Sequence, residues 1–306
     1  MKVIVIIPAK DEEANIGNVL SRIPSYCSVV VVNDGSIDKT KEVAESHGAT
    51  VISNHKSMGV GYTFRKGINY ALEQGSDYII NIDADGQMFP EDIPWLLLPL
   101  IRGEAGMSTA IRFGFKHIPY KMPLLKKWGN KFFSKFTSKL VNDKFRDTQC
   151  GFRAYTRETA TKLVLFSDFT YTQESFISLA SKGVNIVEIP LFIHGQRKGK
   201  SKVVKNVFDY GRKALSAMLL SFRDYKPFSF FGLPGLAMLT TGFVIEIVML
   251  VRKLFFEKPF FDYPWLILLG IVLFLTGVLL IIFYLLADMN VRNKKIMEEI
   301  ICKLKM

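Results

Sequence analysis

Apolar and polar positions follow a repeating order over the first 112 residues. Continuous runs rich in Val and Ile predict strands buried on both faces, at 2–8, 29–33 and 77–83. A shorter strand is expected at 50–53. Segments with helical periodicity lie between the strands, at about 11–22, 38–47 and 60–73. Asp11 is the expected N-cap of the first helix. This alternation predicts an α/β domain with a mostly parallel sheet and helices on both faces.

Two long apolar segments dominate the C-terminal part of the chain, at 228–251 and 265–287. Each is long enough to cross the ~30 Å hydrocarbon core of a bilayer as a helix. The first contains one charged residue, Glu246, and the second contains none. We therefore expect a transmembrane hairpin at 228–287 and a tail at 288–306 that returns to the side of the N-terminal domain. Lys and Arg flank the outer ends of the hairpin, which favours a cytoplasmic location for both ends.

The chain holds 40 Lys and Arg against 28 Asp and Glu, a formal net charge of +12. Such an excess indicates an anionic partner, and it is concentrated at 115–146 and 197–226. Within about 119–141, Trp128 and several Phe and Leu residues recur at helical spacing among lysines, as in helices that lie in a membrane interface. A juxtamembrane amphipathic helix is expected at 201–227. Nucleic acid is the rival partner, but the apolar spans in the same chain favour lipid.

Polar turns follow three of the predicted strands, at Lys10–Glu12, Asn33–Ser36 and Asp83–Gln87. The carboxyl ends of parallel strands share one edge of a sheet, and ligands of α/β proteins bind there. Asp83 and Asp85 can engage a hard divalent cation, Mg²⁺ or Mn²⁺, while a diphosphate fills its other coordination positions. No G-x-G-x-x-G sequence follows the first strand and no P-loop sequence is present. These absences argue against dinucleotide-binding and P-loop proteins.

Four motifs together resemble those of family 2 glycosyltransferases of the GT-A fold. They are 6–13 (IIPAKDEE), 31–40 (VVNDGSIDKT), 82–87 (IDADGQ) and 146–156 (RDTQCGFRAYT). More narrowly, the chain resembles the polyprenyl-phosphate glycosyltransferases, which include the dolichyl-phosphate mannose and glucose synthases. Its D-T-Q-C-G-F sequence is closer to the glucose synthases. The resemblance covers about residues 1–220 and implies a Rossmann-like GT-A catalytic domain at 1–200.

The resemblance also implies roles for individual residues at the sheet edge. It assigns the nucleotide-sugar to Pro8, Ala9, Lys10, Glu12, Asn33, Asp34, Gly35, Ser36, Asp83 and Ala84. It assigns the metal to Asp83, Asp85 and Gln87. Asp34 would contact the base, and Arg112 matches a basic residue that the family places near the diphosphate. A divalent ion on Asp85, helped by Arg112, would then stabilise the charge that develops on the leaving diphosphate.

The acceptor side is predicted from two further segments. A lipid phosphate has a second pKa of ~6 and is largely an anion at neutral pH, so it needs cations rather than a general base. The resemblance places a basic residue ahead of a G-x-S-K sequence, and Arg197, Lys198 and Lys202 supply these cations. Which of the three meets the phosphate stays open. Asp147 would either act as a base or organise the acceptor loop.

Together these features predict a metal-dependent hexosyltransferase in the cell membrane or an endomembrane. It would move one sugar from a donor of the UDP-glucose or GDP-mannose type to a polyprenyl (dolichyl) phosphate on the cytoplasmic face. One alternative is a glycolipid synthase that transfers sugar to a lipid hydroxyl, with Asp147 as its base. Another is a non-catalytic membrane scaffold that kept the fold. The transmembrane helices could also pair two copies of the chain.

Overall fold

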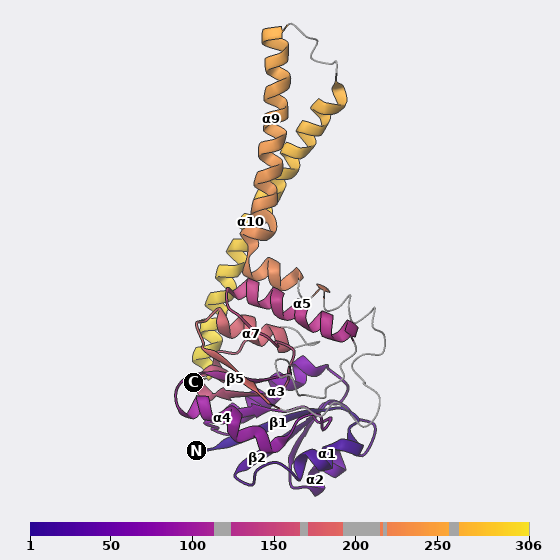
Figure 1. Ribbon diagram of the computed structural model, residues 1–306, viewed down its shortest axis with the longest axis vertical. Helices are drawn as coiled ribbons and strands as arrows, with labels where there is room; N and C mark the ends of the chain where they lie inside the picture. Colours follow the sequence, from indigo (N-terminus) through magenta and orange to yellow (C-terminus); the bar gives the residue numbers. More distant parts are fainter. Residues whose placement is uncertain (113–123, 166–170, 192–214, 217–218, 257–262, 306) are drawn as a thin grey trace. The chain divides into compact units, whose positions relative to one another are not determined.

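The computed structural model describes residues 1–112, 124–165, 171–191, 215–216, 219–256 and 263–305 (Figure 1). The chain forms two compact units. One comprises Met1–Lys205 together with Ile301–Met306, and the other comprises Asn206–Ile300.

The first unit is built on a sheet whose seven described strands have the order β3-β2-β1-β4-β6-β5-β7. The strands are β1 (Val3–Ala9), β2 (Cys27–Asn33), β3 (Thr50–Ser53), β4 (Tyr78–Asn81), β5 (Met107–Ile111), β6 (Arg153–Thr156) and β7 (Ile186–Pro190). Among them, β6 alone runs antiparallel to its neighbours, β4 and β5. The predicted mostly parallel sheet is therefore confirmed. Because β6 runs in the opposite direction, it begins at the edge where the other strands end.

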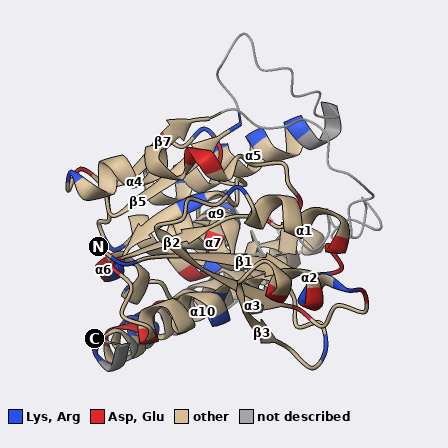
Figure 2. Cartoon of the chain, turned by 90° about the horizontal axis from the view of Figure 1, so that it is seen from below, with Lys and Arg blue, Asp and Glu red and all other residues tan. Residues whose placement is uncertain are grey.

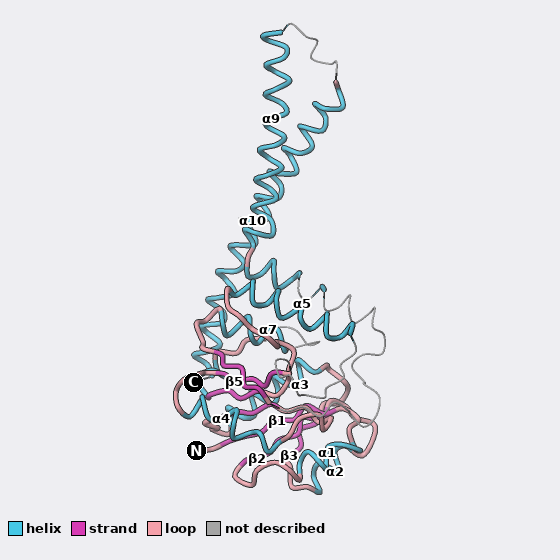
Figure 3. Tube along the Cα trace, in the orientation of Figure 1, coloured by secondary structure: helices cyan, strands magenta, loops and turns pink. Residues whose placement is uncertain are grey.

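Helices cover both faces of this sheet. They are α1 (Glu13–Leu20), α2 (Thr40–Ser46), α3 (Val60–Glu73), α4 (Ile93–Ile101), α5 (Leu124–Val141), α6 (Arg157–Thr161) and α7 (Thr172–Ala180), with a short 3-10 turn at Pro90–Asp92. Figure 3 shows their alternation with the strands. The strand at 50–53 and the helix at 60–73 have the bounds that the sequence predicts.

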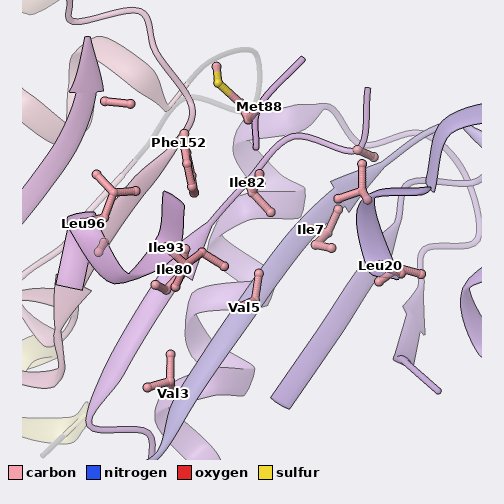
Figure 4. Packing of buried hydrophobic residues seen from close by; sticks show 14 of the residues in the cluster. Val3, Val5, Ile7, Leu20, Ile80, Ile82, Met88, Ile93, Leu96 and Phe152 are labelled. Carbon is pink, nitrogen blue, oxygen red and sulfur yellow. The ribbon is translucent and has the colours of Figure 1, made fainter. Parts of the chain in front are cut away.

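The central strand β1 is apolar throughout because both of its faces are covered. Val3, Val5 and Ile7 pack in one core with residues of α1 and α4 (Figure 4). Ile4 and Ile6 belong to a second core with residues of α3 and α7. Successive side chains of a strand point to opposite faces, so a fully apolar strand divides its residues between two cores.

The first helix starts one residue later than the predicted N-cap implies. Asp11 is not its N-cap: it has a positive φ of 49°, and its Oδ1 accepts a hydrogen bond from Ile37 N at 2.9 Å. The N-cap position falls on Glu12, whose side chain makes no capping hydrogen bond. The carboxylate of Asp11 therefore joins two turns of the sheet edge instead of starting the helix.

The second unit contains two long helices, α9 (Leu233–Phe256) and α10 (Pro264–Lys305), of which α10 extends into the last residues of the first unit. A π-helical turn at Phe228–Gly232 precedes α9. Spans at Phe228–Phe255 and Pro264–Ile300 are long and apolar enough to cross a membrane, and 17% of the most apolar window of each is buried. Helices of a soluble core would bury these windows, so the exposed apolar surface favours lipid over a buried helix pair.

Glycines let α9 and α10 approach each other closely. A Cβ on Gly242 would lie 2.5 Å from the backbone nitrogen of Phe274, and a Cβ on Gly277 would lie 2.5 Å from that of Leu239. Close backbone contact of this kind is typical of helix pairs in membranes. Glu246 also lies at this contact, because a Cβ on Gly270 would meet its Oε1.

Two predicted segments look different in the structure. The expected tail at 288–306 is not separate from the second span, because α10 continues without a break to Lys305. Residues 288–305 contain no Gly or Pro, and Arg292 pairs with Asp288 one turn earlier at 2.7 Å, which supports the helix. Of the predicted juxtamembrane helix at 201–227, residues 215–216 and 219–225 are helical, whereas 201–214 and 217–218 lie outside the described residues.

Candidate active site

Three predicted turns meet at the carboxyl edge of the sheet. The first follows β1, and the second and third follow its neighbours β2 and β4. Backbone and side-chain hydrogen bonds join the first two turns: Asp34 N donates to Ala9 O at 2.8 Å, and Asp11 N donates to Ser36 Oγ at 2.9 Å. Ile82 N donates to Ile6 O at 3.2 Å, which ties the third turn to β1. The predicted clustering of these polar turns is therefore observed.

The residues of the first turn differ in their surroundings. Pro8 and Ala9 close β1, and Lys10 is exposed at the sheet edge. Glu12 is buried, and its carboxylate accepts a hydrogen bond from Asn15 Nδ2 at 2.9 Å. Lys10 is thus the residue of this turn whose charge is open to an incoming anion.

The second turn is shaped by a glycine. Asn33 Oδ1 accepts a hydrogen bond from Ser36 N at 3.1 Å and closes the turn. Gly35 has a φ of +65°, and a Cβ there would lie 2.7 Å from the carbonyl carbon of Lys56. A larger residue at this position would be strained by the positive φ, and its side chain would collide with the backbone at Lys56.

Asp34 is buried and holds the segment 54–59 against the second turn. Its Oδ1 accepts from Asn54 Nδ2 at 2.9 Å and Met58 N at 2.8 Å. Its Oδ2 accepts from Ser57 Oγ at 2.8 Å and Gly59 N at 3.1 Å. Burial opposes ionisation, but these four donors outweigh it and lower the pKa of Asp34. Asp34 is therefore an ionised carboxylate that also organises its loop, and its contact with the base stays a prediction.

The third turn carries the proposed metal ligands. Asp85 Oδ1 accepts a hydrogen bond from Gln87 N at 3.0 Å, so the two residues share one tight turn. The carboxylate of Asp83 lies over Gly151, where a Cβ would stand 2.7 Å from its Oδ2 and 2.9 Å from the hydroxyl of Tyr171. Asp83 thus faces the start of β6, and Ala84 between the two aspartates is buried.

This donor set fits a divalent ion that is shared with a diphosphate. The described residues contain no group of three His, Cys, Asp or Glu side chains that could hold a metal by themselves. Mg²⁺ commonly takes one or two carboxylates from the protein and completes its shell with water and substrate phosphate oxygens. Asp85, with Asp83 and Gln87 beside it, supplies hard oxygen donors of that kind.

Arg112 and Asp147 form a buried ion pair in the described site. Arg112 follows β5, and its Nε and Nη2 donate to the two carboxylate oxygens of Asp147 at 2.7 and 2.8 Å. Arg112 N also donates to Asp147 at 3.1 Å, as does Gln149 N. A bidentate contact of this geometry fixes the orientation of the guanidinium. The structure thus brings two predicted site residues into direct contact.

The surroundings of Asp147 bear on its two predicted roles. The side chain is fully buried. Burial would raise its pKa, but the hydrogen bonds and charge of Arg112 outweigh that effect and lower the pKa. A carboxylate with a low pKa and occupied oxygens is a poor proton acceptor. The contacts therefore support the organising role of Asp147 rather than the role of a base.

Three site residues beneath the sheet edge were missed in the sequence. Arg153 is fully buried on β6, where its Nε donates to Cys150 O at 2.8 Å and its Nη2 to Thr148 O at 3.0 Å. Asn81 Nδ2 donates to Gly151 O at 2.6 Å and to the hydroxyl of Tyr171 at 2.8 Å. The signal in the sequence was a polar residue inside an apolar strand, but the partners lie up to 90 residues apart.

Helix α5 has its polar side inward and aromatic side chains outward. Asn130, Ser134 and Thr137 are buried, and Ser134 Oγ accepts a hydrogen bond from Thr148 N at 3.1 Å. Trp128 and Phe132 are 76% and 56% exposed. Exposed lysines lie among them, at Lys127, Lys131, Lys135 and Lys139 (Figure 2). Exposed aromatic side chains next to buried polar ones are unusual for a helix in a water-soluble protein. Residues 119–123 of the predicted interfacial helix lie outside the described residues, as do Arg197, Lys198 and Lys202.

Comparison with known proteins places the fold and the family of this chain. The fold is similar to that of glucosyl-3-phosphoglycerate synthase from Mycobacterium tuberculosis, whose structure in complex with Mn²⁺ and UDP-glucose superposes with a TM-score of 0.54 at 20% identity. The match covers 72% of this chain and 78% of that one. The model of the family "Glycosyl transferase family 2" matches residues 4–164, and the chain belongs to this family.

Among the relatives whose names describe an activity, two are compared with this chain. The UDP-N-acetylglucosamine–dolichyl-phosphate N-acetylglucosaminyltransferase of Methanococcus voltae is 29% identical over 208 residues, which are 61% of this chain and 83% of that protein. The polyprenol monophosphomannose synthase of Mycolicibacterium smegmatis is 26% identical over 221 residues, which are 66% of this chain and 81% of that protein. The predicted resemblance to polyprenyl-phosphate glycosyltransferases is thereby confirmed.

Proposed function

We propose that the chain transfers one sugar from a nucleotide-sugar to a polyprenyl (dolichyl) phosphate at a membrane surface. The observation that carries this proposal is the ion pair between Arg112 and Asp147. The pair gives the site an oriented cation for the leaving diphosphate, while its buried carboxylate is too strongly paired to serve as a base for the acceptor. Such a site suits an acceptor that arrives already ionised, as a phosphate does at neutral pH. A lipid hydroxyl would have to be deprotonated.

The proposed reaction depends on the charges of the two substrates and of the site. An oxygen of the lipid phosphate attacks the anomeric carbon of the sugar, the glycosidic bond to the donor breaks, and the nucleoside diphosphate leaves with the electron pair. Positive charge held where this negative charge develops lowers the barrier. Arg112 provides such charge from the chain, and Lys10 is placed to attract the donor. A divalent ion held by Asp83, Asp85 and Gln87 would neutralise the diphosphate. Arg197, Lys198 or Lys202 is proposed to hold the acceptor phosphate.

The membrane elements support a lipid acceptor. Two spans of membrane length anchor the chain, and the outer side of α5 offers Trp128 and Phe132 among lysines. Aromatic side chains with lysines around them match the boundary between headgroups and acyl chains. The phosphate of a polyprenyl lipid lies at this boundary. Transfer on the cytoplasmic face, in the cell membrane or an endomembrane, remains part of the proposal.

The two named relatives use different sugars, N-acetylglucosamine in one and mannose in the other. The donor is therefore best tested by a screen rather than assumed. Purified full-length chain in liposomes would be incubated with labelled UDP-glucose, UDP-N-acetylglucosamine or GDP-mannose. Parallel samples would contain polyprenyl phosphate, the matching polyprenol or neither lipid. We expect a labelled lipid with polyprenyl phosphate only, and mild acid should release its sugar.

A matched pair of variants tests the site in the same assay. Arg112→Ala should reduce transfer by about 100-fold or more, because the variant lacks the guanidinium that stabilises the negative charge on the leaving diphosphate. Arg102→Ala serves as the control, since Arg102 is an exposed arginine paired with Glu104 at 3.9 Å. Transfer of sugar to the polyprenol, with an acid-stable product, would mean that the acceptor is a lipid hydroxyl and not a lipid phosphate. Activity of Arg112→Ala equal to that of Arg102→Ala would contradict the proposal.

A further inference from the structure

Glu188 on β7 contacts the site through the backbone of the turn that carries Asp147. Its Oε1 accepts two hydrogen bonds, from Arg146 N at 2.8 Å and from Asp147 N at 2.9 Å. Strand β7 is parallel to β5, with Glu188 opposite Thr109, and β5 leads directly into Arg112. One carboxylate thus connects the strand next to Arg112 with the turn that orients Arg112.

The placement of Glu188 next to Asp147 has an electrostatic cost. Glu188 is partly buried, and burial raises its pKa; the charge of Asp147 adds to the rise, which the two backbone donors only partly offset. The charge of Glu188 therefore does not explain why a carboxylate stands there. Its hydrogen bonds do, because a single oxygen at this position holds two successive amide groups of the turn.

We propose that Glu188 is a positioning residue for Arg112, acting through the turn of Asp147. The proposal rests on the proposed function, in which Arg112 meets the leaving diphosphate. The backbone at 146–147 sets the position of the Asp147 carboxylate, and that carboxylate fixes the guanidinium by two short hydrogen bonds. Without the oxygen of Glu188, the turn and the guanidinium shift together. A misplacement of ~1 Å at a reacting centre can cost about 100-fold in rate.

Two conservative variants separate a hydrogen-bond role from a charge role. Glu188→Gln keeps an acceptor oxygen at the same reach and removes the charge. Glu188→Asp keeps the charge and withdraws the oxygen by one methylene. We expect Glu188→Gln to retain kcat within about twofold, and Glu188→Asp to lose about 10-fold or more in kcat with little change in donor KM. The opposite order, with Asp active and Gln impaired, would overturn the proposal.

A double-mutant cycle shows whether Glu188 acts through Arg112. Residues that act as one unit are strongly non-additive. Glu188→Asp should therefore cost little further activity in the Arg112→Ala background. An equal loss in both backgrounds would mean that Glu188 acts independently of Arg112, and the proposal would fail.

A measurement without turnover keeps this result separate from the proposed function. The Nε–H of Arg112 in ¹⁵N-arginine-labelled protein can be assigned with Arg112→Lys, and its exchange with solvent reports the pair with Asp147. Exchange should be faster in Glu188→Asp and unchanged in Glu188→Gln. Equal exchange in all three proteins overturns the positioning role, even if transfer is observed. Faster exchange in Glu188→Asp without transfer to any lipid supports it and refutes the proposed function instead.

Discussion

At the scale of single residues, the site depends on carboxylates whose environments differ sharply. Asp34 and Asp147 are held as anions by hydrogen-bond donors, and Glu188 is held next to another carboxylate. All three side chains bind the backbone or an arginine of their own domain. Asp83 and Asp85, by contrast, lie in the turn predicted to face the diphosphate. Asp34, Asp147 and Glu188 thus shape the site by binding their own domain, whereas Asp83 and Asp85 stand in the turn that is predicted to bind the ligand.

The opposite pKa shifts of Asp147 and Glu188 predict opposite effects of pH on stability. Asp147 has a lowered pKa in the folded chain, so its stabilisation is present above its unfolded pKa of ~3.9 and is lost as pH falls through the folded value. Glu188 has a raised pKa, so its contribution is present below ~4.3 and is lost as pH rises through the folded value.

Thermal unfolding over a pH series would measure both effects. Asp147→Ala should lower the free energy of unfolding by about 3–5 kcal/mol at pH 7, because it leaves the charge of Arg112 without its partner. The loss should be smaller at acidic pH. Glu188→Gln should be at least as stable as the natural chain at pH 7. Below pH 4 its stability relative to the natural chain should be lower than at pH 7. Parallel pH profiles for Glu188→Gln and the natural chain would refute the assignment for Glu188.

Gly151 is required by the close approach of Asp83. A Cβ at this position would meet the carboxylate of Asp83 and the hydroxyl of Tyr171 at 2.7 and 2.9 Å. Gly151→Ala should therefore displace Asp83 and weaken binding of nucleoside diphosphate by about 10-fold, equivalent to ~1.4 kcal/mol. Gly129→Ala on α5 is the control, since a Cβ there meets nothing within 4 Å, and calorimetry should show no change in affinity.

Asp85 is the residue on which metal dependence is expected to rest. Asp85→Ala should abolish sugar transfer, by about 100-fold or more, while leaving the unfolding temperature nearly unchanged, because Asp85 is partly exposed. Transfer by the natural chain should disappear in excess chelator and return with Mg²⁺ or Mn²⁺. Undiminished transfer in chelator would refute the metal assignment.

At the scale of elements, α5 and α4 both expose a tryptophan but should differ in their contact with lipid. Trp128 on α5 is surrounded by exposed lysines, whereas Trp95 on α4, 59% exposed, is not part of a basic segment. In single-tryptophan variants reconstituted into bilayers, brominated lipids should quench Trp128 and leave Trp95 unaffected. Equal quenching of both, or of neither, would contradict an interfacial position that is specific to α5.

At the scale of the whole molecule, one compact unit contains residues from both sides of the hairpin. Met1–Lys205 precede the first span, and Ile301–Met306 follow the second. Two crossings return a chain to the side from which it started. The division of the chain is therefore consistent with the predicted hairpin, and pairing of these helices between two copies stays a prediction.

Labelling of single cysteines with a membrane-impermeant reagent would test this topology. In a chain without its three natural cysteines, Lys2→Cys and Lys303→Cys should react from the same side, because both replace exposed residues of the first unit. Tyr263→Cys, which replaces an exposed residue at the start of α10, should react from the other side only. Labelling of Tyr263→Cys and Lys2→Cys from one side would rule out the hairpin.

The sequence by itself determined the features that depend on local pattern. The buried strands, the polar turns after them and the two apolar spans follow from periodicity, segment length and turn chemistry, which need no knowledge of distant residues. Only the tertiary structure decided what the polar residues do. Asp11 bonds the β2 turn instead of capping a helix, Asp147 pairs with Arg112, and Arg153 lies beneath the turn at 148–150. The partner of Asp11 follows from the pairing of β1 with β2, and those of Asp147 and Arg153 from the antiparallel insertion of β6 between β4 and β5; no local pattern encodes this strand order.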